Sequence, residues 1–491
     1  MGTMAATFRD GVLERRFRFA EHGTTFARDT MAGVTTFIVM SYIIFLNPII
    51  LTSVKPKVGA ALPFEGVVTA TCVVAAVMTI LMGLYSNKAF ALAPGLGINA
   101  IVAFQLVGQQ GLSFPSAMGL IVLEGVVVTV LVLTGLREAI MKAIPLQLKK
   151  AIAIGIGLFI AFIGLYNSGI VVTGSGEPVT LGRFTTWPIF VAFVGIVLTL
   201  ALRARGFKGD LLVGIIGTTV VATIVNSATS HKAFGTSTAT WPGWSHIAGW
   251  GNWSLFGNFD FHAFSKLGVI SALVWVFALF LSDFFDTMGT LVGVGKPAGY
   301  LNAAGEFPDI RRPLLVDSLA AIAGGVSSTS SATTYIESGS GVAAGGRTGW
   351  VAVVCGGLFL PFLFFAPLIG MVPAQATAAA LIIVGYLMVS SLTEGEDEAE
   401  IEEGLAAKGR AKLAGIDFHD LGIGLPAALV IMLMPFSYSI TNGIGFGFIA
   451  YVLIRASQGR TRDVHPLMWV ISAAFTLYFF VPLLQDHVSW M

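Results

Sequence analysis

The sequence predicts an all-α polytopic membrane protein with a transporter fold of two inverted repeats, each of seven membrane spans. Three observations predict it. Hydrophobic residues make up 55% of the 491-residue chain and charged residues only 11%, whereas a soluble domain carries about 25% charged residues. Apolar segments of about 20 residues, the length that crosses a bilayer core, recur from end to end. Two of them, at corresponding places in the two halves, are interrupted by helix-breaking residues. The composition therefore excludes a water-soluble protein. The net charge of +1 lacks the excess of positive charge that nucleic-acid-binding proteins carry.

The candidate spans are the apolar stretches between polar connections. Seven lie in the first half of the chain, at residues 31–51, 66–85, 91–107, 114–135, 150–172, 187–203 and 211–228. Eight lie in the second half, at 268–294, 311–327, 330–346, 348–371, 375–391, 422–437, 440–456 and 466–486. The fifteenth either spans the bilayer or lies along the membrane or the helix bundle, so the side of the C-terminus stays open.

Basic residues set the expected orientation, because Lys and Arg gather in cytoplasmic loops. Here they follow the even-numbered segments, at Arg137, Lys142, Lys149, Lys150, Arg203, Arg205, Lys208, Lys296, Arg311, Arg312, Arg347, Arg455, Arg460 and Arg462. We therefore expect residues 1–29 to form a cytoplasmic tail. The Trp-rich connection 229–267 is expected to be an extracellular loop, and the acidic run 394–403 a solvated loop.

An odd number of spans per half inverts the second half relative to the first. In inverted-repeat transporters the substrate binds near the midplane, where broken helices from both halves meet. The third segment contains APGLGINA at 93–100, and the tenth contains SGSGVAA at 338–344. An offset of 244 places Gly95, Gly97 and Ala100 on Gly339, Gly341 and Ala344. We expect each segment to hold a short extended stretch leading into a half-helix, because irregular backbone at membrane depth must be buried in protein or line a wet cavity.

Five carboxylates fall inside predicted spans, at Glu124, Asp283, Asp286, Asp317 and Glu337. Inserting each one into the membrane costs at least about 2.5–3.5 kcal/mol, so each is expected to have a hydrogen-bonding or charged partner or a functional role. For Glu124, Asp283 and Asp317 we expect capping of half-helices or of buried backbone donors. Asp286 and Glu337 lie beside Gly or Ser/Thr clusters that break the helix, which favours a functional role. Asp283 and Asp286 share a helix face, and two such neighbours raise each other's affinity for protons.

No motif in the sequence indicates an enzyme, a cofactor or a metal site. The seven histidines lack metal-ligand spacing, and nucleotide-binding glycine loops are missing. This argues against an ATP-driven pump, so the energy for transport comes from an ion gradient, or there is none.

Five ordered sequence runs point to a family. They are AGVTTFIVMSYIIFLNP at 32–48, APGLGINA at 93–100, FDTMGTL at 285–291, TTYIES and GGRTG at 333–338 and 345–349, and MPFSYSI and NGI at 434–440 and 442–444. In these runs the chain resembles the AzgA-like guanine, hypoxanthine and adenine permeases of the nucleobase:cation symporter-2 group, the nucleobase-ascorbate transporters. The resemblance extends from about residue 9 to 470.

The resemblance implies a uracil-permease-like fold with a core domain, a gate domain and two short strands in the third and tenth segments. It also implies a homodimer in the plasma membrane and proton-coupled purine uptake. The expected parts are the tail 1–29, core halves 30–136 and 268–372, gate halves 137–228 and 373–457, the loop 229–267 and a C-terminal segment 458–491.

The same motifs imply a substrate site. Asp286 and Glu337 fall where the superfamily places its substrate-binding carboxylates in the eighth and tenth helices. Asn99 and Ala100 fall at the strand-to-helix junction that contacts the base, and Thr334 and Tyr335 precede Glu337. We expect Phe37, Phe104 or Tyr335 to cover a ring face, and Asp283, Asp286 or Glu337 to carry the proton.

The sequence thus favours a proton-coupled symporter of guanine, hypoxanthine or adenine. The first alternative is an anion exchanger of the same architecture, which predicts a basic residue at the half-helix junctions, where acidic residues stand instead. A second is a channel or a membrane-embedded receptor, which would not accumulate labelled purine in a saturable, pH-gradient-dependent way. The preferred purine, H⁺ or Na⁺ as the ion, and the oligomeric state stay open.

Overall fold

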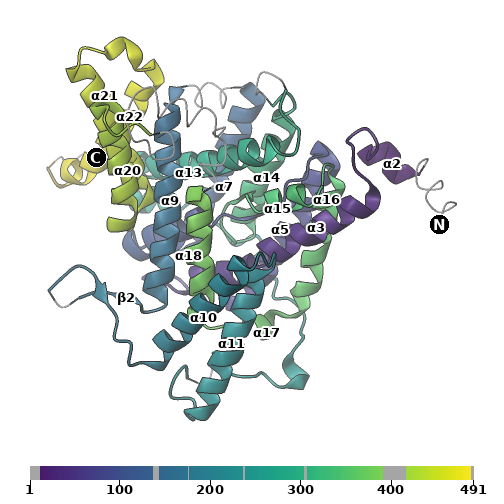
Figure 1. Ribbon diagram of the computed structural model, residues 1–491. Helices are drawn as coiled ribbons and strands as arrows, with labels where there is room; N and C mark the ends of the chain where they lie inside the picture. Colours follow the sequence, from purple (N-terminus) through teal and green to yellow (C-terminus); the bar gives the residue numbers. More distant parts are fainter. Residues whose placement is uncertain are drawn as a thin grey trace.

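A computed structural model gives the structure of the protein, shown in Figure 1. It describes residues 11–135, 143–174, 176–235, 238–302, 307–390 and 416–487. The predicted acidic run 394–403 lies outside these residues.

The first half of the chain forms helices close to the predicted bounds. They are α2 (Val12–Phe17), α3 (Phe26–Met40), α4 (Ile43–Thr52), α5 (Phe64–Ser86), α6 (Leu96–Ala100), the π-helix η1 (Ile101–Gln109), α7 (Phe114–Thr134), α9 (Leu146–Asn167), α10 (Trp187–Ala204) and α11 (Asp210–Ala228). The first predicted span is two helices, because the chain breaks at Ser41 and Tyr42. The fifth ends earlier than predicted, since Val171–Val172 form strand β2, which pairs with β3 (Thr180–Leu181).

The second half begins after the long connection, which holds η2 (Trp244–His246) and α12 (Ala263–Leu267). Its helices are α13 (Val269–Gly295), α14 (Arg311–Val326), α15 (Ser338–Ala343), α16 (Trp350–Phe359), η3 (Leu360–Phe364), α17 (Ala366–Ile369), α18 (Ala374–Ser390), α20 (Leu421–Phe436), α21 (Ile440–Ser457), η4 (Thr461–Asp463) and α22 (Pro466–His487). Eight helical stretches of the described residues are long and apolar enough to cross a bilayer. The chain is therefore a multi-pass membrane protein.

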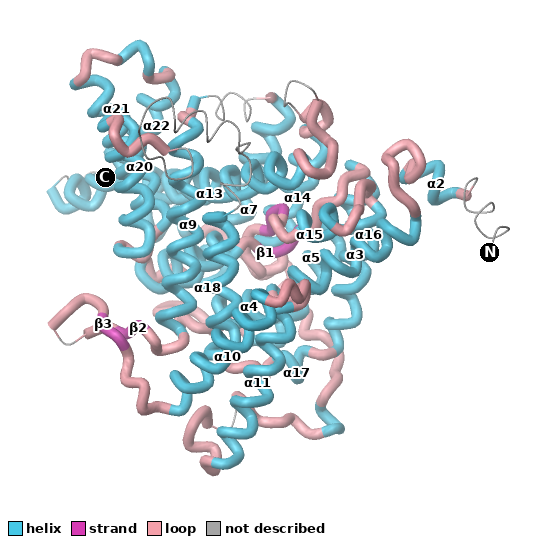
Figure 2. The backbone as a smooth tube through the Cα atoms, viewed as in Figure 1, coloured by secondary structure: helices cyan, strands magenta, loops and turns pink. Residues whose placement is uncertain are grey.

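Two three-residue strands meet at the centre of the molecule (Figure 2). β1 (Leu92–Pro94) and β4 (Ala332–Thr334) pair antiparallel, with Ala93 opposite Thr333. Pro94 has no N–H, which a strand of a two-stranded ribbon tolerates. Ser328 and Ser330, before β4, have left-handed φ values of 54° and 72°. The predicted extended stretches are thus confirmed.

Each strand leads into a short half-helix, as the sequence predicts. The register differs from the predicted offset of 244, because the first residues of the half-helices are Leu96 and Ser338. Gly95 therefore corresponds to Glu337, the residue that caps α15, and not to Gly339. The glycine matches in the sequence do not mark structural equivalence.

The helices fall into two groups that pack chiefly within themselves. One group contains α3, α4, α5, α7, α13, α14, α15 and α16 with the strand pair β1–β4, and we call it the strand-bearing group. The other contains α9, α10, α11, α18, α20 and α21, and we call it the second group. In the second group, α9 and α18 approach so closely that a Cβ at Gly385 would lie 2.3 Å from the Gly157 carbonyl oxygen. Only a glycine fits there.

A buried carboxylate fastens the start of α3 to the turn before α16. Asp29 is fully buried, and its oxygens accept from the Thr24 hydroxyl at 2.6 Å and from the Thr348 hydroxyl at 2.5 Å. The backbone N–H groups of Arg347 and Thr348 donate to it at 3.1 Å and 3.0 Å. Asp29 thus satisfies backbone donors that the turn leaves without helical partners.

The long connection between the halves lies over helix ends of the strand-bearing group. The Asp260 carboxylate accepts from the Ser116 hydroxyl at 2.7 Å and from the His262 backbone N–H at 3.0 Å. Partial burial acts to raise the pKa of Asp260, but these hydrogen bonds and His262 prevail and hold it below its usual value. The loop is therefore bound to α7 by an ionised carboxylate.

The fifteenth apolar segment is helix α22, which packs on α21 and α13. The Phe475 ring contacts Phe448 and Phe277 with centroids 6.2 Å and 5.9 Å apart. These contacts place α22 against the helix bundle.

Candidate functional site

A cavity of about 100 Å³ lies where the two half-helices meet the second group of helices. Its strand-bearing wall comes from Leu96 and Gly97 of α6, from α13, and from residues 334–337. The facing wall comes from α9 and α18, through Ala153, Ile156, Ile160, Val384 and Met388. The site therefore lies on the seam between the two groups.

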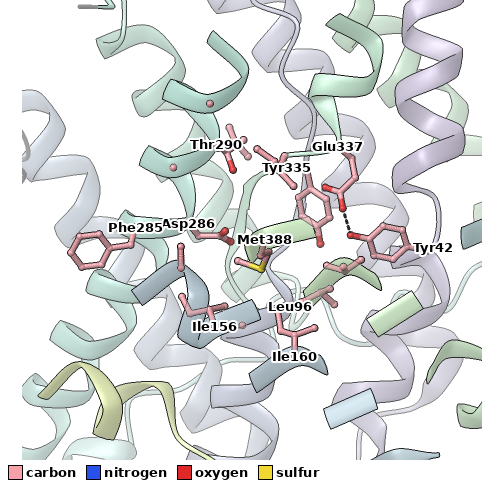
Figure 3. Close-up of a pocket in the computed structure, with 17 residues that line it drawn as sticks. Tyr42, Leu96, Ile156, Ile160, Phe285, Asp286, Thr290, Tyr335, Glu337 and Met388 are labelled. Atoms are coloured by element: carbon pink, nitrogen blue, oxygen red, sulfur yellow. Dashed lines mark hydrogen bonds between the residues drawn. The ribbon is translucent and has the colours of Figure 1, made fainter. Parts of the chain in front are cut away.

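Asp286 and Glu337 line the same cavity from opposite sides (Figure 3). Asp286 is carried by α13, and its carboxylate points into the cavity while the neighbouring Phe285 ring points away from it. The Thr333 hydroxyl of β4 donates to the Asp286 carboxylate at 3.3 Å. The structure thus brings together the two acids that the sequence singles out.

Glu337 stands at the N-terminus of α15, where the chain leaves β4. The Tyr42 hydroxyl donates to its Oε1 atom at 2.5 Å. Tyr42 lies at the break between α3 and α4, only 1% exposed, and lines the cavity itself. The sequence reasoning missed this residue, although a Tyr after a Ser within an otherwise apolar predicted span was a possible signal.

Tyr335 and Thr334, also predicted, line the cavity. The Tyr335 hydroxyl donates to the Pro94 carbonyl oxygen at 2.5 Å, which holds β4 against β1. The Thr334 backbone N–H donates to Asp317 at 3.0 Å. The Tyr335 bond thus ties the end of β4 to β1 and the Thr334 bond ties β4 to α14, and both side chains complete the wall beside Glu337.

Five predicted residues do not line this cavity, namely Phe37, Asn99, Ala100, Phe104 and Asp283. Ala100 lies deeper in α6, and Asn99 is fully buried, with no hydrogen-bond partner for either amide atom among the described residues. Phe37 packs on Phe359 and Phe362, with ring centroids 5.0 Å and 5.6 Å away. Phe37 lies outside the site because the break that presents Tyr42 comes more than one helical turn later.

The remaining buried carboxylates serve neighbouring polar groups. Asp317 accepts from the Thr287 hydroxyl at 2.8 Å as well as from β4, so it satisfies buried donors as expected. The Ser331 hydroxyl lies 3.4 Å from a Glu124 oxygen and 3.3 Å from an Asp283 oxygen. Asp283 therefore sits one helical turn from Asp286, on the side of Glu124.

Among the described lining residues, α9 and α18 contribute only apolar side chains, including Ile156, Ile160 and Met388. Nothing in the sequence distinguishes them, because apolar residues in a span look alike whether they face lipid, another helix or a cavity. The described lining residues therefore offer two carboxylates, four hydroxyl-bearing side chains (Tyr42, Thr290, Thr334 and Tyr335) and an apolar surface.

A family model described as "Permease family" matches residues 28–399. The chain is 36% identical over 471 residues to the adenine permease AdeP of Escherichia coli (strain K12), covering 96% of each chain. It is 37% identical over 471 residues to the guanine/hypoxanthine permease PbuG of Bacillus subtilis (strain 168), covering 94% of this chain and 98% of that protein.

Among solved structures, the transmembrane domain of a cyanobacterium bicarbonate transporter, BicA, superposes with a TM-score of 0.57. The match covers 85% of this chain and 97% of that chain, at 13% sequence identity. At that identity the likeness shows the fold alone, which is the predicted arrangement of seven plus seven inverted spans.

Proposed function

Because this chain belongs to the permease family, and within it to the AzgA-like purine permeases of the nucleobase:cation symporter-2 group, we propose that it takes up purine nucleobases by proton-coupled symport. The chain is a permease and not an enzyme. We place it in the plasma membrane with its N-terminus in the cytoplasm, as the distribution of basic residues predicts.

The observation that carries the proposal is the pair of carboxylates facing one cavity between the half-helices. A purine is a flat and largely neutral ring system whose edge carries N–H donors beside ring-nitrogen or carbonyl acceptors. Asp286 and Glu337 accept from the N–H groups, while Thr290, Thr334 and backbone N–H groups of α6 serve the acceptors. The Tyr335 ring and the apolar side chains of α9 cover the faces.

Transport follows from movement of the strand-bearing group against the second group, which we propose to be the core and gate domains. The cavity of about 100 Å³ is smaller than the roughly 300–1,000 Å³ of typical ligand sites. The two groups therefore have to separate to admit a base. Separation on alternate sides exposes Asp286 and Glu337 first to one compartment and then to the other.

The proton is carried by Asp283 or Asp286, with Glu337 as the third candidate. Asp283 and Asp286 lie one turn apart on α13, and each is close to a hydroxyl of the β4 region, at 3.3 Å. Two carboxylates this close in a low dielectric do not both stay ionised, so one of them binds a proton that leaves when the site opens inward.

Uptake of labelled hypoxanthine, guanine and adenine by cells that lack their own permeases tests the proposal. We expect saturable uptake that a protonophore abolishes and that removal of Na⁺ leaves unchanged. Asp286→Asn and Glu337→Gln should each lower kcat/KM at least tenfold. Glu65→Gln, which changes an exposed carboxylate at the start of α5, is the matched control. Normal transport by both site variants would show that the site is wrongly assigned.

A further inference from the structure

A second cavity, of about 630 Å³, lies beside the last turns of α9. Five of its eight lining residues are aromatic: Phe104, Phe162, Tyr166, Phe436 and Tyr438. Most of its lining residues lie toward the ends of the third, fifth and thirteenth predicted spans, on the side that the charge pattern predicts to be extracellular. In Figure 1 this end of α9 lies beside the hairpin β2–β3.

The two cavities follow each other along α9. Ile160 lines the candidate site and Phe162 lines the second cavity. Residues two apart on a helix lie about 3 Å apart along its axis but on nearly opposite faces, so α9 contributes one face to each cavity. Both cavities also touch the third span, through Leu96 and Gly97 in one case and Phe104 in the other. The two cavities therefore share two elements, α9 and the third span.

Aromatic rings close the seam between them. The Tyr438 ring lies with its centroid 5.1 Å from Phe104 and 5.3 Å from the buried Phe159, edge to face in both cases. Phe104 belongs to η1, which continues from the strand-bearing group, whereas Phe159 and Tyr438 belong to the second group. Tyr438 is held in the turn between α20 and α21 with a left-handed φ of 52°. Movement of the two groups apart would break the ring contact between Phe104 and Tyr438.

A polar pair lies next to this aromatic barrier. The Ser439 hydroxyl donates to Gln105 Oε1 at 3.0 Å, and these residues follow Tyr438 and Phe104 in sequence. Gln105 is 0% exposed, and its Nε2 atom has no hydrogen-bond partner within the described part of the chain. Leaving a buried amide group without a hydrogen-bond partner is unfavourable. An acceptor that arrives as the seam opens would remove this penalty.

We propose that the second cavity is an outer vestibule that binds a planar purine base by stacking before the base reaches Asp286 and Glu337. Tyr438 and Phe104 form the barrier between the two cavities, and Gln105 donates to an acceptor of the passing base. Aromatic side chains stack on any base, because every base has a flat π face. The vestibule therefore favours planar molecules over non-planar ones, and the inner carboxylates distinguish one purine from another. This inference rests on purine transport as proposed above.

The first test separates capture by the vestibule from binding at the inner site. Phe162→Leu combined with Tyr166→Leu removes two ring faces but keeps apolar volume. Phe190→Leu, on α10 and 46% exposed, is the matched control because Phe190 lines neither cavity. We expect the double variant to raise KM for purine uptake about tenfold, while equilibrium binding of labelled adenine to the purified protein stays within twofold. Glu337→Gln should abolish that binding.

The outcomes distinguish the two proposals. If the wild-type protein neither binds nor transports purine, the proposed function fails. If it does both and the double variant matches Phe190→Leu in KM, only the vestibule is refuted.

The second test uses thiol labelling. The two natural cysteines, Cys72 and Cys355, are fully buried, so the background reaction is small. Phe162→Cys should react with a membrane-impermeant thiol reagent applied from outside, and saturating adenine should slow that reaction at least fivefold. A lipid chain filling the cavity would leave the rate independent of adenine. That result, or reaction from the cytoplasmic side only, overturns the proposal.

Discussion

Replacing Tyr42 with phenylalanine tests how Glu337 is held. The change removes only the hydroxyl that donates to Glu337 at 2.5 Å and keeps the ring that fills the break between α3 and α4. A hydrogen bond to a charged group is worth about 1.5–3 kcal/mol. Since about 1.4 kcal/mol is a factor of ten, we expect kcat/KM for purine uptake to fall about 10- to 150-fold. Leaving Glu337 without this donor favours its neutral form, which accepts less well from a ring N–H.

The measurement is the initial rate of labelled hypoxanthine uptake over a range of concentrations, with thermal unfolding of the purified protein alongside. Tyr85→Phe is the matched control, because Tyr85 is 47% exposed on α5. If Tyr42 acts through Glu337, adding Tyr42→Phe to Glu337→Gln should change uptake by less than threefold. Uptake within twofold of wild type for Tyr42→Phe alone, or full additivity in the double variant, would refute the reasoning.

Three further outcomes are expected. Asp29→Ala leaves buried backbone donors of the turn before α16 without an acceptor and should cost about 3–5 kcal/mol, seen as a clear loss of Tm and of folded protein at the membrane. Gly385→Ala should lower both Tm and uptake, because its Cβ would overlap the α9 backbone, whereas Gly357→Ala, with open space around its Cβ, should be neutral or slightly stabilising. Asp260→Asn should lower Tm at pH 7. Because the folded state holds the pKa of Asp260 below its usual value, its stabilisation is present above about pH 4 and is lost as pH falls through the lower folded-state value, so the variant and wild type should converge in acid. An Asp260→Asn difference that grows in acid would contradict this sign.

The spans were predictable from the sequence because a bilayer imposes one physical condition on all of them. A helix must run about 20 apolar residues, so α5, α7 and α13 begin and end within two residues of their predicted bounds. The same condition identified Asp286 and Glu337, since a carboxylate at membrane depth is too costly to be incidental. Pro94 and the Ser/Thr run before β4 revealed the broken segments in the same way.

The tertiary structure alone decided which side chains meet. Whether Phe37 or Tyr42 faces the cavity depends on where α3 ends. The periodicity of the sequence does not predict the exact residue at which a helix ends. The apolar walls from Ile156 and Met388 could not be told from lipid-facing positions, because lipid and a helix interior are equally apolar. The contact between Phe104 and Tyr438 joins residues more than 300 positions apart, and only the packing of the two helix groups brings their rings together.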